Sequence, residues 1–428
     1  MNIIKRISAM TNGWQFMLAA IVALVFSVSV ARAGAVSDWN AIALQSMVTA
    51  ARPGPSGILD VAMVQVAVYD AVQAIEREYE PYYADIPDAE GSSIAATAKA
   101  AHDVLVSRYP AQAAALDITY ENYLIANGIP ANDPGVAVGA AAAAAIIALR
   151  ACDGSFPNPA PPPFIGGTGI GVWRPTPPGF SAMNPGPWFG RVTPFAMSRP
   201  SQFRSSPPPS LTSHRYTREY NEVKAKGALT GSTRTPEETD MAQFYAGNFV
   251  VMLNKLLRDL AEDIEGNSDN SRFFALATMS MADTLIAVWN DKSHYVFWRP
   301  ITAIQNGDLD GNPNTAGDAA WLSLIPSPPY PDHSSGANGI TGATMRALRN
   351  YFRRDRKDFS ITTTNTGPTN LDTREYTRFS QAARDVVDAR VYLGIHFRFA
   401  DEAGRNVGEN VADWVFDNFG RRLYHHND

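Results

Sequence analysis

The chain has 428 residues, of which 45% are hydrophobic and 18% are charged, so it has material for a large core and is not a disordered protein. Its formal net charge of −6 excludes the broad basic character that nucleic-acid binding needs. The single cysteine, Cys152, excludes an internal disulfide framework and any cysteine-rich metal centre.

Residues 1–33 have the pattern of a secretory signal peptide. Lys5 and Arg6 precede an apolar stretch over residues 16–30, and residues 31–33 read Ala-Arg-Ala, as signal peptidase sites do. An uncleaved membrane anchor is the alternative, because the apolar stretch approaches the length of a membrane span. We expect export to the periplasm or the extracellular space, with no membrane attachment after cleavage.

Residues 34–152 are predicted to form an N-terminal helical region, because apolar residues recur there at helical spacing. Ser37 or Asp38 is expected to cap its first helix. No segment after the signal is predicted to cross a membrane. The expected helices span residues 39–51, 58–76, 95–109, 111–127 and 134–151.

Residues 153–235 differ in composition from the rest of the chain. Residues 153–210 hold 15 of the 30 prolines, interspersed with eight Phe and Trp residues. A flexible linker would be polar, so an ordered segment that wraps the surface or borders a cleft is predicted. A plain connection between two parts of the chain is the alternative.

Residues 236–428 are predicted to form a catalytic helical region. The turn at Asp308–Pro313 resembles a calcium loop, but its sixth residue is Pro313 where an EF-hand needs glycine. No long alternating strand is present. Helices are expected over residues 236–258, 271–298, 336–354, 374–392 and 401–419.

A first polar motif holds Lys292 and Arg299, seven residues apart, followed by Pro300. Seven residues are close to two helical turns, so both cations are expected on one face, with Pro300 marking the helix exit. Buried cations require anionic partners. The alternative is a pair of surface charges whose stems lie over aromatic neighbours.

A second motif spans residues 328–337, where prolines lead through His333, Ser334 and Ser335 to Gly336. The order predicts a helix N-terminus, whose free N–H groups bind anions. The alternative is that Ser334 or Ser335 only caps the helix.

A third motif places Arg390 six residues before His396 in an apolar setting. A single histidine there is more often a core residue than a ligand. Taken together, the three motifs supply three cations, a hydroxyl, a helix N-terminus and one imidazole. This set predicts a site for a tetrahedral oxyanion with one bond to histidine.

The order Lys-x6-Arg-Pro, Pro-x3-Ser-Gly and Arg-x5-His resembles the phosphatidic acid phosphatase type 2/vanadium haloperoxidase superfamily. Residues 37–40, 67–72 and 298–304 resemble its exported bacterial haloperoxidase-like branch. The resemblance implies an all-α fold, a large helical bundle with long proline-rich ordered loops.

The resemblance also implies roles for individual residues. His396 matches the histidine that coordinates vanadium in the peroxidases and attacks phosphorus in the phosphatases. The implied cofactor is vanadate, or phosphate in a phosphatase. The implied partners are hydrogen peroxide and halide, or a small phosphoester, and a homo-oligomer is compatible with the resemblance. The implied oxygen-binding groups are Lys292, Arg299, Arg390, Ser335 and the N–H of Gly336.

The second motif departs from the family pattern, because Ala337 stands where an acid–base histidine usually follows Gly336. Three interpretations remain open. His333 substitutes from the preceding loop, His294 serves instead, or no acid–base histidine exists. General acid–base help typically contributes ~10²–10⁴-fold to a rate.

The third motif departs as well, because the family often has an acidic residue four positions after its histidine, and here that position is Ala400. Asp401 or a backbone carbonyl could then orient the ring of His396.

Three functions are therefore compared. A vanadate-dependent haloperoxidase is favoured on the overall resemblance. The alternatives are a soluble acid-phosphatase-type hydrolase working through a phosphohistidine and a catalytically divergent oxyanion-binding protein.

Overall fold

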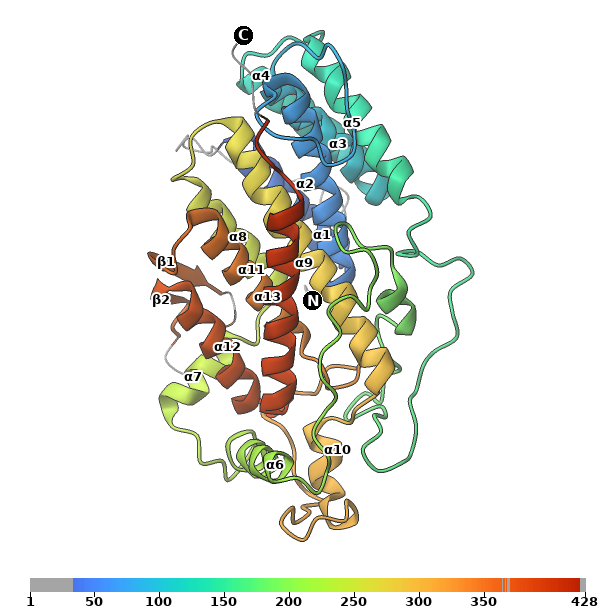
Figure 1. Cartoon of the computed structure of the whole chain (residues 1–428), viewed down its shortest axis with the longest axis vertical. Coiled ribbons are helices and arrows are strands. Elements are labelled where there is room, and N and C mark those ends of the chain that lie inside the picture. Colours follow the sequence, from blue (N-terminus) through green and yellow to red (C-terminus); the bar gives the residue numbers. More distant parts are fainter. Residues whose placement is uncertain (1–33, 364, 366, 368–369, 424–428) are drawn as a thin grey trace, which may run out of the picture. The chain divides into compact units, whose positions relative to one another are not determined.

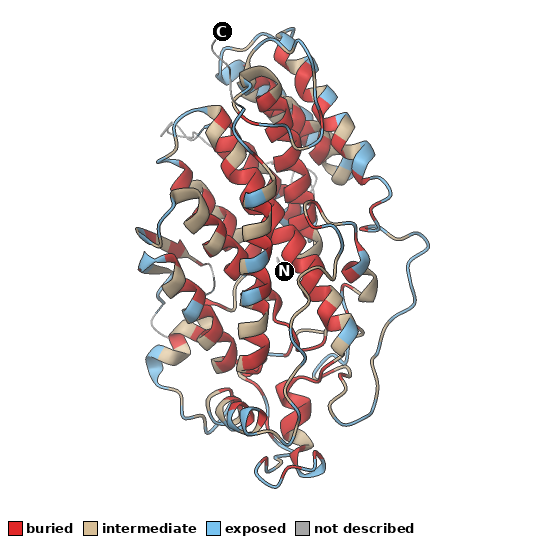
Figure 2. Ribbon diagram, viewed as in Figure 1, coloured by how far each residue is buried: buried red, intermediate tan, exposed pale blue. Residues whose placement is uncertain are grey.

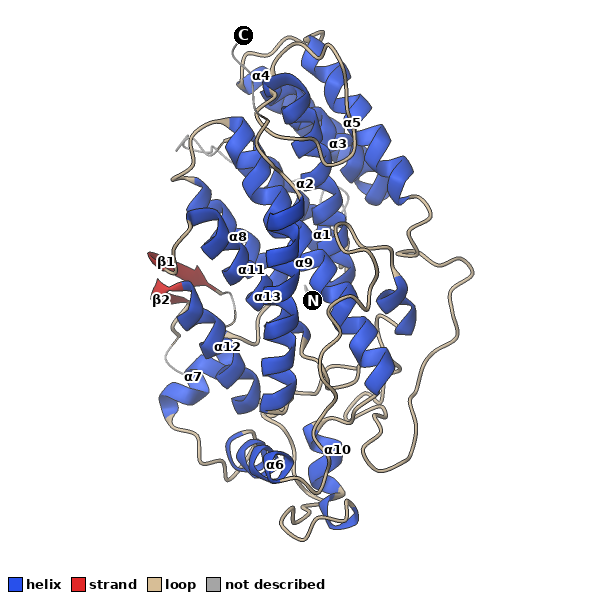
Figure 3. Ribbon diagram, in the orientation of Figure 1, coloured by secondary structure: helices blue, strands red, loops and turns tan. Residues whose placement is uncertain are grey.

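The computed structural model describes residues 34–423 except 364, 366, 368 and 369, so the predicted signal peptide lies outside the described residues. The described chain is mostly helical, with one two-stranded hairpin (Figure 3). The predicted all-α fold class is confirmed.

Five α-helices form the first part of the described chain: α1 (Ala35–Thr49), α2 (Gly54–Glu76), α3 (Ser93–Arg108), α4 (Ala113–Ala126) and α5 (Pro134–Arg150). The other α-helices are α6 (His214–Lys226), α7 (Pro236–Phe244), α8 (Phe249–Ala261), α9 (Asn267–Tyr295), α10 (Pro300–Gln305), α11 (Gly336–Phe352), α12 (Phe379–Tyr392) and α13 (Arg398–Asn418). Strands β1 (Arg356–Thr362) and β2 (Thr373–Arg378) pair antiparallel. Three short 3₁₀ turns are η1 (Pro110–Gln112), η2 (Pro187–Arg191) and η3 (Gly307–Leu309).

The first helix begins earlier than predicted. Gly34 occupies the N-cap position of α1, so Ser37 and Asp38 lie inside the helix and the predicted cap is wrong. The Asp38 carboxylate instead accepts a hydrogen bond of 2.9 Å from the hydroxyl of Tyr123. The side chain of Asp38, which the local sequence pattern assigned to helix capping, therefore makes a tertiary contact with Tyr123 instead.

Two predicted helices in the C-terminal region are wrong in extent. The predicted helix 236–258 is two helices, because the side chain of Asn248 accepts hydrogen bonds from two N–H groups and starts α8. The predicted helix 374–392 starts only at Phe379, since β2 precedes it. Tyr376 of β2 is buried and shares a hydrogen bond of 2.6 Å with Tyr245. Burial of this ring against the fold favours the strand.

Helix α9 lies at the centre of the fold. It packs against α2 from the N-terminal part and against α11 and α13 from the C-terminal part (Figure 1). Its residues are buried along most of its length (Figure 2). Both α2 and α9 are long and apolar enough to cross a membrane, contrary to the sequence prediction, but 94% of the most apolar window of each is buried inside the protein. Burial in a core accounts for this apolar character.

Helices α11 and α13 cross at very short range, which positions the second motif. A Cβ atom at Gly404 would overlap the carbonyl oxygen of Ser335, and one at Gly408 would overlap that of Gly339. Glycines at these positions therefore let α13 lie directly against the start of α11.

The proline-rich segment lies along α9 and the first motif as ordered chain. The buried carboxylate of Asp283 in α9 accepts backbone hydrogen bonds of 2.6–2.8 Å from Phe195, Ala196 and Met197. The N–H of Trp173 donates to the carbonyl of Val296 at 2.7 Å. These bonds attach the segment to the elements that carry the candidate site.

Candidate oxyanion site

The first motif is not one continuous helix. Helix α9 ends at Tyr295, Val296 turns the chain with a left-handed φ of 46°, and Arg299 occupies the N-cap position of α10. The prediction that Lys292 and Arg299 share a helical face is therefore wrong. The turn, not the helical period, brings the two cations together.

Both cations of the first motif are completely buried, so the alternative of surface charges is wrong. The Nζ of Lys292 donates to the carbonyls of Pro331 at 2.7 Å and Asp332 at 3.0 Å. Nε of Arg299 donates to the carbonyl of Tyr330 at 2.8 Å. The ring of Tyr330 lies about 5 Å from both charged groups. The second motif thus surrounds the cations of the first.

His396 of the third motif joins these cations. Its Nδ1 lies 2.7 Å from Oδ1 of Asp332, and Nη1 of Arg299 lies 3.2 Å from its Nε2. A carboxylate only accepts, so this contact assigns the proton to Nδ1 and leaves the lone pair on Nε2. Burial, reinforced by the charges of Arg299 and Lys292, holds the pKa of His396 well below its usual value. Neutral imidazole is the form that acts as a ligand or nucleophile.

Asp332 is the functional residue that the sequence reasoning missed. It is fully buried and orients His396, a task that was assigned to Asp401 or to a backbone carbonyl. Burial raises the pKa of Asp332 to about 7. It lies inside the second motif, between Pro331 and His333, and being the only acidic residue there was the available signal.

Arg390 lies in the last turn of α12. It is 7% exposed, its Nη1 donates to the carbonyl of Tyr245 at 3.0 Å, and its charge lowers the pKa of His396. Within the described chain, Nε of Arg390 and Nη2 of Arg299 are buried without a hydrogen-bond partner. Buried donors without partners are costly, and an oxyanion would satisfy both.

Ser335 and Gly336 form the start of α11, as predicted. Both are buried, and the side chain of Ser335 makes no capping hydrogen bond. The hydroxyl of Ser334 donates to Asp291 at 3.0 Å instead of capping the helix. The N-terminus of α11 therefore keeps N–H groups available for an anion.

Five buried charged side chains give this site a positive balance: Lys292, Arg299, Arg390, Asp332 and Asp401. Burial next to Arg299 holds the pKa of Lys292 well below its usual value. Burial also raises the pKa of Asp401 well above its usual value. An anion bound among the three cations would offset their mutual repulsion and the free energy lost when they are removed from water.

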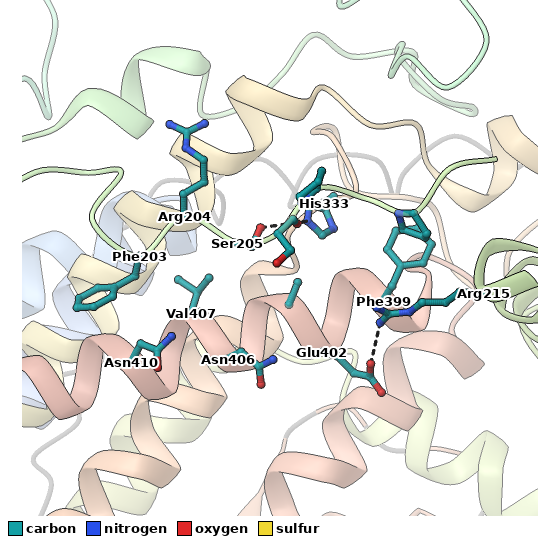
Figure 4. A pocket seen from close by; sticks show the side chains of 14 residues that line it. Phe203, Arg204, Ser205, Arg215, His333, Phe399, Glu402, Asn406, Val407 and Asn410 are labelled. Carbon is teal, nitrogen blue, oxygen red and sulfur yellow. Dashed lines mark hydrogen bonds and ion pairs between the residues drawn. The ribbon is translucent and has the colours of Figure 1, made fainter. Parts of the chain in front are cut away.

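His333 lies at the edge of this site, in the wall of a cavity of about 390 Å³ (Figure 4). Ser205 and Ser206 of the proline-rich segment and Phe399 also line this cavity. Nε2 of His333 lies 3.0 Å from the Ser205 hydroxyl and 2.9 Å from the Ser206 carbonyl. By contrast, His294 is exposed, with its ring against Tyr295, and the structure does not bring it to the site.

Solved structures similar to this chain have the same fold over most of its length. A structure described as the first bacterial vanadium-dependent iodoperoxidase matches with a TM-score of 0.77 and 22% identity, covering 92% of this chain and 98% of that one. The holo form of a bacterial vanadium-dependent chloroperoxidase gives a TM-score of 0.68 and 18% identity, covering 86% and 92%.

The motif-bearing region also matches in sequence. A family model, the VCPO second helical-bundle domain, matches residues 272–424, which include all three motifs. The vanadium chloroperoxidase of Curvularia inaequalis is 28% identical over 200 residues, or 39% of this chain. Residues 272–424 are thus similar in sequence, and most of the chain is similar in fold, to vanadium haloperoxidases. The match covers only 32% of the length of the fungal enzyme.

Asp332→Asn tests how this site orients its histidine. The amide can donate to Nδ1 and so favour the tautomer that carries the proton on Nε2, where it blocks a bond. We expect orthovanadate and orthophosphate to bind about 10–100-fold more weakly, as for other groups that orient a ligand. Isothermal titration calorimetry measures this. Asp308→Asn, in an exposed turn, is the control, and equal affinities of the two variants would contradict the role.

Proposed function

We propose that this chain is a vanadate-dependent haloperoxidase-like enzyme, which oxidises a halide ion with hydrogen peroxide at an oxyanion held by His396. The observation that carries the proposal is the buried group of three cations around a neutral histidine, in which Arg299 and Arg390 each keep a donor without a partner among the described residues. We also propose export as its localisation, on the pattern of residues 1–33.

The residues present fit vanadate by the chemistry of their donors. Nε2 of His396 offers a lone pair, and cationic and backbone donors around it suit a tetrahedral anion. The groups that would hold the oxygens are Lys292, Arg299, Arg390, Ser335 and the N–H of Gly336. When bound, vanadate supplies the Lewis-acid chemistry that activates hydrogen peroxide toward a halide.

The protein's own residues must then handle protons. One halide ion, one hydrogen peroxide and one proton give one hypohalous acid and one water, so each turnover consumes a proton. Asp332 holds His396 in one tautomer, and burial of the site limits water around the reacting groups. Ala337 has no group that transfers a proton, so the proton passes through another side chain.

His333 is poorly suited to donate a proton at neutral pH. Nε2 donates to the Ser206 carbonyl, which leaves the lone pair on Nδ1, a buried atom without a partner in the described chain. Burial lowers the pKa of His333 to about 4, so the ring is neutral at pH 7. A pKa near 4 also makes His333 a weak base, so we propose that it holds Ser205 and Ser206 at the edge of the site and that the proton donor is another residue.

The burial of neutral His333 predicts a pH-dependent stability. Its pKa is about 4 in the folded protein and about 6.5 in the unfolded chain, so the unfolded chain binds the proton first as the pH falls. The free energy of unfolding should therefore drop between pH 6.5 and pH 4, by about 3 kcal/mol in total from this residue.

His333→Gln should remove that contribution, so the variant loses about 3 kcal/mol less than the wild type over the same pH range. Urea unfolding at pH 7, 5.5 and 4.5 measures the difference. His294→Gln, which changes an exposed histidine, is the control and should follow the wild type. Parallel curves for wild type and His333→Gln would exclude a buried neutral ring.

A phosphatase has less support from the same site. A phosphohistidine mechanism needs an acid that protonates the leaving alkoxide. His333 is unprotonated at neutral pH, and Ala337 cannot replace it. Only phosphoesters with good leaving groups would then react.

One experiment separates the three candidate functions. The purified protein is assayed for bromide and iodide oxidation with hydrogen peroxide, with and without added orthovanadate, beside hydrolysis of p-nitrophenyl phosphate. We expect vanadate-dependent halide oxidation and little hydrolysis. Hydrolysis without oxidation would favour the phosphatase, and tight anion binding with neither activity would favour the divergent binding protein.

A further inference from the structure

A second buried carboxyl group, that of Asp401, has no role in the site so far. Asp401 lies in the first turn of α13, directly against the start of α11, and is completely buried. Its Oδ1 accepts a hydrogen bond of 2.8 Å from Nδ2 of Asn338, and it shares a hydrogen bond with the Ser335 side chain. Its Oδ2 is buried without a partner among the described residues. A buried carboxyl oxygen without a partner, close to the oxyanion site, suggests that Asp401 has a functional role.

The close crossing of α11 and α13 fixes this carboxyl beside the oxyanion site. The backbone N–H of Ser335 donates to the carbonyl of Ala400 at 2.9 Å, one residue before Asp401. Glycine at 404 allows that approach, because a Cβ there would overlap Ser335. The hydroxyl of Ser335 therefore lies beside Asp401, at the N-terminus of α11.

The charges that face Asp401 come from every motif: Lys292, Arg299, Arg390 and Asp332. Burial raises the pKa of Asp401 well above its usual value, and the charge of Asp332 acts in the same direction. Both effects favour the neutral, protonated form of this carboxyl group. Asp401 is hydrogen-bonded to Asn338, the residue directly after Ala337, which stands at the position of the missing histidine.

We propose that Asp401 is a positioning residue that stores a proton and passes it through the hydroxyl of Ser335, in place of the histidine missing at Ala337. The inference rests on the proposed function, because it concerns the proton that each turnover consumes. Ser335 touches the oxyanion oxygen, and Asp401 acts only through Ser335.

The relay balances in atoms and electrons. The O–H bond of Ser335 breaks as its proton passes to the oxygen that Ser335 contacts, and the O–H bond of Asp401 breaks as its proton forms a new O–H bond at Ser335. Each bonding electron pair stays on the oxygen that loses the proton, which leaves Asp401 as a carboxylate. Asp401 recovers a proton from solvent, which supplies the one proton that each turnover consumes. The redox change stays between hydrogen peroxide and halide.

Asp401→Asn tests the proposal, because the amide keeps the size of the side chain but carries no transferable acid proton. We expect kcat for halide oxidation to fall by about 10²–10⁴-fold, the usual contribution of a general acid, while KM for halide changes little. The loss should be greatest at high pH, where solvent supplies few protons. Asp401→Glu should restore part of the rate.

Infrared difference spectroscopy gives a readout without turnover. At pH 7 the spectrum of the wild type minus that of Asp401→Asn should show the C=O stretch of a protonated carboxylic acid, shifted in D₂O, and the spectrum of Asp308→Asn should match the wild type in this region. Orthophosphate should bind to wild type and to Asp401→Asn with affinities within about threefold at pH 7. A group that only held Ser335 in place would weaken phosphate binding instead, and would show no protonated band.

The two failures are distinguishable. If the wild type shows the band and binds phosphate but oxidises no halide with vanadate, the proposed function fails and the stored proton stands. If the wild type oxidises halide and Asp401→Asn matches its rate, or if the spectra of the two are the same, the relay is overturned.

Discussion

His396→Ala should abolish halide oxidation, with a loss of about 10⁴-fold or more, because it removes the one lone pair that the site aims at an oxyanion. The same variant should lose tight binding of orthovanadate, since only the cationic and backbone donors remain. Steady-state oxidation of bromide or iodide measures the first effect and calorimetric titration the second.

His102→Ala is the matched control for this result. His102 is also a buried histidine, 6% exposed, with its ring nitrogens at 2.8 and 2.9 Å from Asp103 and Asp117. It lies in α3, among the helices of the N-terminal part. The control should lose stability but keep oxyanion binding. Activity that survives His396→Ala would place the chemistry at another residue.

Arg299→Met should cause the largest loss of stability among single changes at the site. The guanidinium donates to the carbonyls of Tyr330 at 2.8 Å and Ile395 at 2.6 Å and lies 3.6 Å from the carboxylate of Asp332. Removing it leaves all three buried groups without that partner. We expect a loss of about 3 kcal/mol in the free energy of unfolding, measured by urea titration at pH 8, where Asp332 is ionised.

The pH dependence gives this prediction a second test. Burial raises the pKa of Asp332 to about 7 although the charge of Arg299 lowers it, so without Arg299 this carboxyl takes up a proton at a higher pH than in the wild type. The deficit of Arg299→Met should therefore shrink as the pH falls from 8 to 6. Arg299→Lys, which keeps the charge but not the planar fork, should lie between the two. Arg354→Met, at an exposed position, should change stability by less than about 0.5 kcal/mol.

The spacing of the motifs, and not the secondary structure between them, carried the functional prediction. Lys292 and Arg299 were expected on one helical face, and they meet although α9 ends between them. The reason is that an oxyanion site needs these residue types whatever the backbone conformation of the segment that carries them. The resemblance to a family was therefore recognisable where the helix boundaries were not.

The local sequence pattern gave wrong predictions where a tertiary contact decides the secondary structure or the partner of a side chain. Residues 374–378 have helical spacing but form β2, because Tyr376 is buried against Tyr245. The partner of His396 could not be read from its own motif, since Asp332 is 64 residues away in sequence.

The sequence by itself determined a helical protein with a histidine and three cations suited to an oxyanion, because hydrophobic periodicity and charge type are local properties. Only the tertiary structure decided that the carboxyl of Asp332 orients His396 and that the carboxyl of Asp401 lies beside Ser335. Both assignments depend on helices from distant parts of the chain packing together, above all on the glycine-mediated approach of α13 to α11. Burial, which shifts the pKa values of Asp332, His333 and Asp401, likewise exists only in the folded chain.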